Sequence, residues 1–72
     1  MGTGARTAEV RIIKIDRGHY QVSAVETTKG KDQHLGGNDV HGTKDVAEDM
    51  AQAAKDGLLD EGFDEVWVRE VK

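Results

Sequence analysis

The sequence contains no cysteine, and that absence excludes two common ways of holding a small chain together. Disulfide bridges and thiolate metal sites both need cysteine, so the chain has to rely on side-chain packing or on association. Chains without disulfides are also typical of the reducing cytoplasm, where we expect this protein to act.

Long apolar runs are missing as well. A membrane-spanning helix needs roughly 18 or more apolar residues in succession, and no run in this chain approaches that length. Residues 1–7 also lack the apolar stretch of a signal peptide. We therefore expect a protein that is neither secreted nor membrane-bound.

Aromatic side chains are scarce, at 4% of the residues, within a hydrophobic total of 36%. The three large rings are Tyr20, Phe63 and Trp67, so one aliphatic core is all that 72 residues can hold. At about 0.05–0.15 kcal/mol per residue, the net stability is on the order of 4–11 kcal/mol, which leaves little room for a strained catalytic geometry. We expect a non-catalytic protein without a cofactor, with a disordered tail at residues 1–7 and a single domain over residues 8–72.

Acidic side chains outnumber basic ones, for a formal net charge of −4. Residues 1–31 carry six basic and three acidic side chains, whereas residues 32–72 carry four basic and eleven acidic ones. Proteins that bind nucleic acid usually present a basic surface that displaces counterions from phosphates. The acidic second half therefore disfavours direct nucleic-acid binding and favours a basic protein partner.

Two strand signals open the chain. Ala8–Asp16 is a dense β-branched run that is too short for a typical helix. His19–Glu26 returns after Asp16-Arg17-Gly18, a sequence suited to a three-residue hairpin loop. We therefore predict an antiparallel hairpin.

The register of this hairpin has two solutions. A three-residue loop places Ile12 opposite Val22, whereas a two-residue turn at Arg17-Gly18 pairs Ile13 with Val22, and the sequence leaves both open. In either register Ile12 and Ile13 point to opposite faces, so one of them lies on the second face of the sheet.

The stretch Thr27–Gly42 holds four glycines among polar side chains. So long a structureless segment would be unusual in a small domain, so we predict a turn at Lys29-Gly30 and a short third strand over Lys31–Leu35. Gly36-Gly37-Asn38-Asp39 stands before a helix, as a phosphate-binding loop would. Its spacing fits neither the dinucleotide nor the P-loop pattern, and Asp39 would repel phosphate, so we interpret it as an ordinary turn.

A helical pattern begins at Thr43, which can serve as N-cap. Gly62 follows the last turn as a left-handed stop, and Phe63 is placed to touch Leu58. The apolar side chains recur three or four residues apart, at Val46, Ala47, Met50, Ala53, Ala54 and Leu58.

The last segment, Glu65–Val71, alternates, with Val66 and Val68 on one face and Trp67 and Arg69 on the other. It predicts a closing strand. The fold class is therefore α+β, a small mainly antiparallel sheet of three to four strands in the order β-β-(β)-α-β with one helix packed on one face.

Two Asp-x-His pairs are the strongest signal for a metal. Asp32/His34 and Asp39/His41 stand seven residues apart and together offer two imidazoles and two carboxylates. Polar side chains need no function in a glycine-rich segment, and no thiolate accompanies them. We expect no bound metal, and a metal-dependent enzyme using these pairs is the most distant alternative.

The strongest signals for a partner lie on the helix and on the last strand. The helix carries a polar stripe opposite its apolar one, formed by Asp45, Glu48, Asp49, Gln52 and Asp56. A solvated helix face would look the same, but the stripe also suits a basic patch, or a nucleic-acid-binding groove in which carboxylates replace phosphates. Trp67, a frequent interface anchor, forms with Arg69 the second predicted binding surface. The sequence equally allows the N-terminal tail or the glycine-rich segment to fold over Trp67, or Val66 and Val68 to face outward instead.

The strand order and the stretch Gly42–Gly62 resemble the small N-terminal domain of HicB-type antitoxins, in which a hairpin precedes an amphipathic helix and a closing strand. The likeness covers most of the chain without a specific motif, and no residue role is carried over. In size and acidity the chain also resembles phage-encoded inhibitors such as anti-CRISPR proteins. We expect first a small protein-binding module, such as an inhibitor from a phage or mobile element, and as alternatives a structural or homo-oligomeric domain or an antitoxin-like domain.

Overall fold

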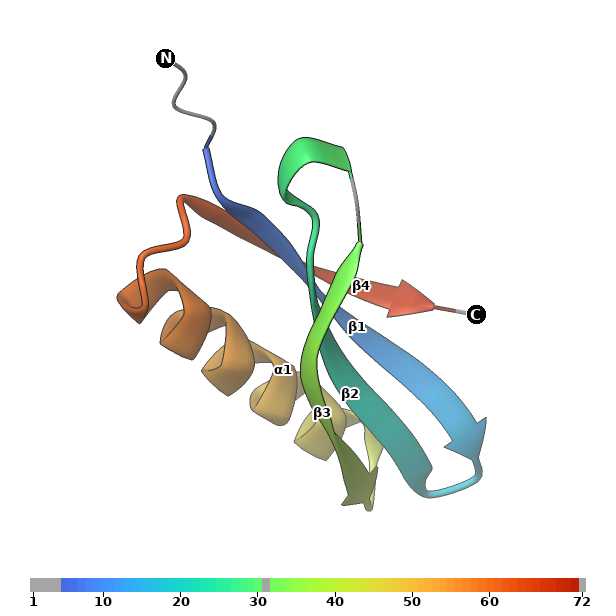
Figure 1. Ribbon diagram of the computed structural model, residues 1–72. Coiled ribbons are helices and arrows are strands. Elements are labelled where there is room, and N and C mark those ends of the chain that lie inside the picture. The colour runs from blue at the N-terminus through green and yellow to red at the C-terminus, as the bar shows by residue number, and fades with distance from the viewer. Residues whose placement is uncertain (1–4, 31, 72) are drawn as a thin grey trace.

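The structure, a computed structural model, describes residues 5–30 and 32–71 and consists of a four-stranded sheet with one helix on one face (Figure 1). The predicted α+β class and element order are confirmed. The elements are β1 (Thr7–Asp16), β2 (His19–Glu26), the 3-10 turn η1 (Thr28–Gly30), β3 (Gln33–His41), α1 (Lys44–Asp60) and β4 (Glu65–Val71).

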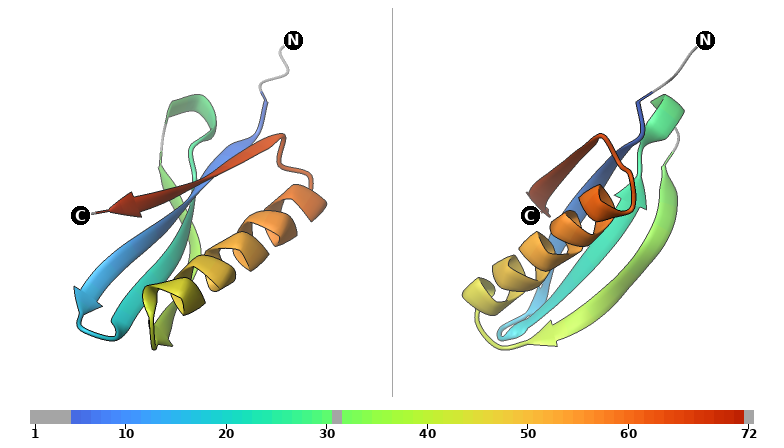
Figure 2. Two further views of the ribbon diagram at one scale, coloured as in Figure 1. Left: turned by 180° about the vertical axis from the view of Figure 1, so that it is seen from behind. Right: turned by 90° about the vertical axis from the view of Figure 1, so that its left-hand side faces the viewer.

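The sheet has the strand order β3-β2-β1-β4. Strand β2 pairs antiparallel with β1 and β3, and β4 pairs parallel with β1. Figure 2 shows α1 lying against one face of this sheet, while no described helix or strand covers the other. We name these the helix face, which includes Val10 and Ile12 of β1, and the open face, which includes Glu9, Arg11 and Ile13.

The three-residue loop is the one that forms, because Ile12 lies opposite Val22 and the ladder is irregular between Lys14 and Asp16. Gly18 supplies the positive φ of 72° that this loop requires. Ile12 is buried against α1, with 3% of its surface exposed, whereas Ile13 is only half-buried on the open face. The prediction that the two isoleucines divide between the faces is confirmed.

Strand β3 differs from its prediction. It runs from Gln33 to His41, so the residues interpreted as a turn, Gly36 to Asp39, are strand residues instead. Glycine has a low strand propensity, but the ladder with β2 satisfies the backbone and overrides it. At Gly37 a Cβ would lie 3.1 Å from the carbonyl oxygen of Val22, so glycine permits this close approach. Lys31, the predicted start of the strand, lies outside the described residues.

Helix α1 follows Thr43, which has the extended backbone of an N-cap but makes no capping hydrogen bond with its side chain. The prediction of one continuous apolar stripe is wrong in part. Ala47 and Leu58 are buried and Ala54 packs against the core, but Val46 and Met50 keep 45% and 37% of their surface exposed, and Ala53 is also exposed. These side chains stay exposed because α1 touches β3 least of the four strands. No helix of the described chain is long and apolar enough to cross a membrane.

The core lies between α1 and the sheet. Its centre is β1, where Ala8 and Val10 are fully buried. Ala51 of the helix belongs to the same buried cluster, and its short side chain lets the helix lie close to the sheet. The buried hydrophobic cluster comprises Ala8, Val10, Ile12, Val22, Val40, Ala47, Ala51, Leu58, Phe63 and Val66.

The helix ends at a glycine, as predicted. The amide of Gly62 donates to the carbonyl of Leu59 at 3.2 Å, and that of Phe63 donates to the carbonyl of Leu58 at 3.2 Å. This pair of bonds is a Schellman motif, and it needs the positive φ of 112° that Gly62 adopts. It turns the chain back so that Phe63 enters the core, with 6% of its surface exposed.

Two glycine-to-alanine substitutions should have opposite effects on stability. Gly62→Ala forces a side chain into a backbone region open only to glycine and should cost about 1–3 kcal/mol. Gly57→Ala lies inside the helix, where a Cβ meets no atom within 4 Å, and should stabilise by about 0.5–1 kcal/mol. Thermal unfolding checks both, since about 1 kcal/mol corresponds to roughly 4–8 °C in a domain of this size. Equal shifts of the same sign would contradict the helix stop.

Candidate protein-binding surfaces

The five predicted residues of the helix all lie on its outer surface. Each of them is exposed, and Glu48, Asp49 and Gln52 line a hollow between the helix and the β1/β4 side of the sheet. Among the described residues, no ion pair neutralises the carboxylates of Asp45, Asp49 or Asp56. Of the two lysines on this helix, Lys44 is held by Glu70 at 2.6 Å, and this hydrogen bond raises the pKa of Lys44, whereas Lys55 is half-buried three residues from Gln52. The acidic surface is thus left available to a partner's cations.

Trp67 and Arg69 lie on the open face. Trp67 is 49% exposed, whereas its neighbour Val66 is buried and Val68 packs against the core, so the structure selects one of the two orientations that the alternation leaves open. Trp67 stands opposite Glu9 in the parallel pair with β1, and Nη1 of Arg69 lies 3.9 Å from the carboxylate of Glu9. The prediction of two surfaces therefore becomes sharper, because the helix surface and Trp67 lie on opposite sides of the sheet.

The structure separates the two Asp-x-His pairs. His34 and Asp39 belong to one extended strand, and at about 3.4 Å per residue they are roughly 17 Å apart along it. His41 instead stacks on His19 with ring centroids 4.4 Å apart, and Asp39 lies 3.9 Å from Nε2 of His19. Among the described residues, no three side chains of the metal-ligating types come together. A single site built from all four residues does not form.

Sequence reasoning missed a groove between β3 and α1. It has a volume of about 590 Å³ and is lined from the strand by Leu35 and Gly36 and from the helix by Met50, Ala53 and Gly57. The groove exists because Gly36 has no side chain to fill the space, and a Cβ there would meet nothing within 4 Å. The only signal in the sequence was the glycine pair inside a strand, which often marks the approach of a ligand or another backbone.

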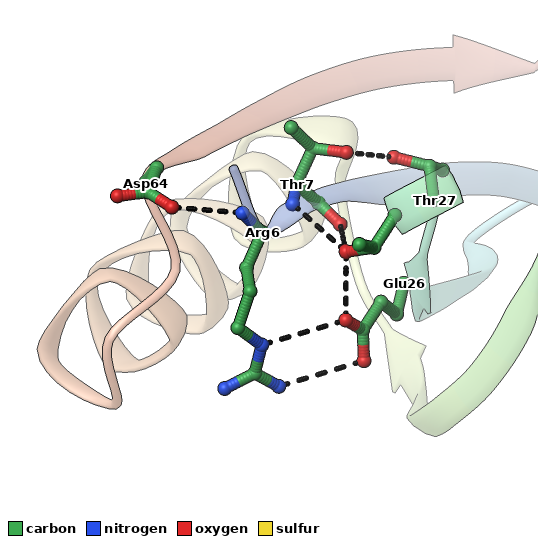
Figure 3. Close-up of polar contacts among 6 residues, drawn as sticks. Arg6, Thr7, Glu26, Thr27 and Asp64 are labelled. Atoms are coloured by element: carbon green, nitrogen blue, oxygen red, sulfur yellow. Dashed lines mark hydrogen bonds and ion pairs between the residues drawn. The ribbon is translucent and has the colours of Figure 1, made fainter. Parts of the chain in front are cut away.

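Arg6 lines one end of this groove and belongs to a cluster of polar contacts (Figure 3). The backbone amide of Arg6 donates to Asp64 at 2.7 Å, and the guanidinium carbon lies 4.2 Å from the centroid of the Phe63 ring. The guanidinium also pairs with Glu26 at 3.5 Å. The predicted disordered tail included Arg6 and Thr7. Thr7 instead begins β1, and its hydroxyl hydrogen-bonds to that of Thr27 at 2.8 Å. Residues 1–4 of that tail lie outside the described residues.

Glu26 makes part of the stability depend on pH. The Thr28 hydroxyl donates to its carboxylate at 2.7 Å, and this bond, followed by those from Arg6, lowers the pKa of Glu26. The unfolded chain therefore binds the proton more readily, so the contribution of Glu26 is fully present above the ordinary glutamate pKa and is lost as the pH falls through the lowered value. Urea unfolding should show the difference between wild type and Glu26→Gln shrinking over that window. A difference independent of pH would contradict this role.

These surfaces offer carboxylates, a tryptophan and an apolar groove to a partner, and each suits non-covalent contact. No protein-family model matches the chain, and neither a curated protein nor a solved structure shows significant similarity to it.

Proposed function

We propose that the protein is a non-catalytic binding module of the cytoplasm that docks a basic protein through the outer surface of α1. The observation that carries the proposal is the concentration of exposed carboxylates on this one surface, without an intramolecular ion pair among the described residues for Asp45, Asp49 or Asp56. The residues in question are Asp45, Glu48, Asp49, Gln52 and Asp56.

The spacing of these side chains supports a partner of opposite charge. Asp45 and Glu48 are three residues apart and Asp45 and Asp49 four, so like charges are neighbours on the helix. Each such pair destabilises an isolated helix by about 0.2–0.5 kcal/mol. A basic partner would remove this repulsion and would be steered by the same field during association.

Apolar neighbours add what a charged surface lacks. Val46 and Met50 are exposed on the same helix, beside the carboxylates. Protein interfaces commonly combine an apolar centre with a polar rim, and this arrangement offers both. A partner whose own basic surface binds nucleic acid would find carboxylates in the place of phosphates, which is the action expected of an inhibitor from a phage or mobile element.

The test compares two variants of the same net charge. Asp49→Asn with Asp56→Asn changes the charge by the same amount as Glu65→Lys, which lies at the start of β4 away from the helix surface. We expect the immobilised wild type to capture basic proteins from a lysate, and raised salt to release them because exposed charges are screened beyond about 8 Å at physiological ionic strength. The double variant should lose this capture and the Glu65 variant should keep it.

The same comparison can refute the proposal. If the double variant captures the same proteins as wild type, the carboxylates only solvate the helix. If capture is lost equally in both variants, net charge rather than this surface attracts the partner.

A further inference from the structure

The β3 edge and the groove beside it together form a site of a recognisable type. Strand β3 has β2 on one side and no described strand on the other, so every second residue turns its N–H and C=O outward. The edge carries no lysine, arginine or proline to discourage pairing. The groove with its apolar walls lies next to this edge, under α1.

Such an edge is suited to an added strand. A peptide laid antiparallel or parallel to β3 would bond through its backbone, and alternate side chains would point toward the helix face. There they would meet Met50 and Ala53, above the gap that Gly36 leaves. Met50 and Leu35 are 37% and 39% exposed, and both would gain apolar cover.

The charge around the groove selects the sequence of that strand. Asp56 stands next to Gly57 and three residues after Ala53, both of which line the groove, whereas Asp49 lines a hollow on the β4 side of the helix. Glu61 adds a carboxylate at the far end, where the Arg6 guanidinium is already paired with Glu26. The rim is therefore acidic and complements lysine or arginine.

We propose that the groove binds an extended segment of a partner protein, with apolar side chains at alternate positions and basic residues beside them, as a fifth strand on β3. The inference rests on the proposed function, because it gives the basic partner a form. A second copy of the chain fits less well. Strand β3 of a second copy would place glycines in the groove, where apolar side chains are needed. Strand β4 of a second copy would bring Glu65 and Glu70 close to an acidic rim.

A displayed library of linear peptides of about ten residues, long enough to cover an edge strand, provides the probe. We expect selection on the wild type to enrich peptides in which apolar and basic residues alternate. Amide chemical shifts should change along β3 and along the Met50 side of α1 when a selected peptide is added.

Two groove variants test the location. Gly36→Val places a branched side chain into the gap and suits a strand, so the fold should keep its thermal midpoint while peptide affinity falls by about tenfold or more, as expected for one lost contact. Ala53→Arg blocks the same gap from the helix side with a good helix former. Leu59→Ala, outside the groove, is the matched control and should bind as wild type does.

Backbone methylation of a selected peptide tests strand addition itself. In a ladder only alternate amides of the peptide donate to β3, so N-methylation at those positions should weaken binding about tenfold and at the intervening positions should not. A groove that reads side chains alone would show no alternation.

The outcomes separate the inference from the proposed function. If no peptide is enriched, or if selected peptides bind Gly36→Val as well as wild type, the groove is not the site, although a lysate protein lost only in the Asp49/Asp56 variant would still support the charged surface. If selected peptides bind the Asp49/Asp56 variant as tightly as wild type, the occupant is not basic and the inference fails. A dimer abolished by Gly36→Val would make the occupant a second copy and would also overturn it.

Discussion

Replacing Phe63 by alanine is expected to cost about 3–5 kcal/mol of unfolding free energy, the usual range for a buried aromatic side chain. Phe63 is 6% exposed and belongs to the buried cluster, at the point where the chain leaves α1 for β4. It is one of only three large rings in the chain, so the aliphatic side chains around it cannot fill the cavity. With a net stability on the order of 4–11 kcal/mol, the loss is a large fraction of the whole.

Thermal and urea unfolding measure this effect. At about 4 °C or more per kcal/mol, the midpoint should fall by roughly 12 °C or more. Phe63→Leu keeps most of the apolar volume but removes the ring beneath the Arg6 guanidinium, so it should cost less than the alanine variant. Leu59→Ala, within the Schellman motif but with a side chain that is 40% exposed, controls for effects on the helix end. A loss below about 1 kcal/mol for Phe63→Ala would place the ring outside the core.

The elements that could be predicted are those in which local chemistry and tertiary packing agree. The β-branched run before Gly18 forms β1, and the helix ends at the glycine that was assigned to stop it. The alternation of β4 placed Val66 and Trp67 on opposite faces, because a period of two leaves only two orientations, and the packing of Val66 decides which of them is inside. In each case one side chain or one dihedral angle decides the outcome.

The rest required contacts that a linear pattern does not contain. The glycines of β3 favour a loop by propensity, and only the ladder with β2 makes them a strand. An irregularity between Ala24 and Val25 shifts the register, so the position of Leu35 could not be counted from the hairpin. The groove follows from these two facts, since it needs both the strand and the absent side chain of Gly36.

The same reasoning explains why the predicted site residues divided. Helical and strand periodicities each assign a side chain to a face of its own element, and both assignments are consistent with the structure. Which faces share one side of the molecule depends on how the elements pack. Asp49 therefore belongs to the helix side of the sheet, whereas Trp67 lies on the open face opposite Glu9.

The two adjacent isoleucines of β1 provide the sharpest test of how the two faces of this strand differ in burial. Ile12→Ala should cost about 2–5 kcal/mol, because Ile12 is 3% exposed beneath the helix. Ile13→Ala should cost about 1 kcal/mol or less, because Ile13 is half-buried on the open face. The residue type and the strand are the same, so the difference in unfolding free energy reports mainly the burial of each face.

The comparison also tests whether two copies of the chain meet through their open faces. If two copies meet through their open faces, Ile13 becomes buried, its alanine variant costs as much as that of Ile12, and the cost rises with protein concentration. Trp67 gives a second readout on the same face. At 49% exposure its emission in the free protein should be red-shifted and open to quenchers. A blue, protected tryptophan together with a costly Ile13→Ala would show that the open face is covered by a second copy, which would end the prediction that Trp67 and Arg69 form a free binding surface.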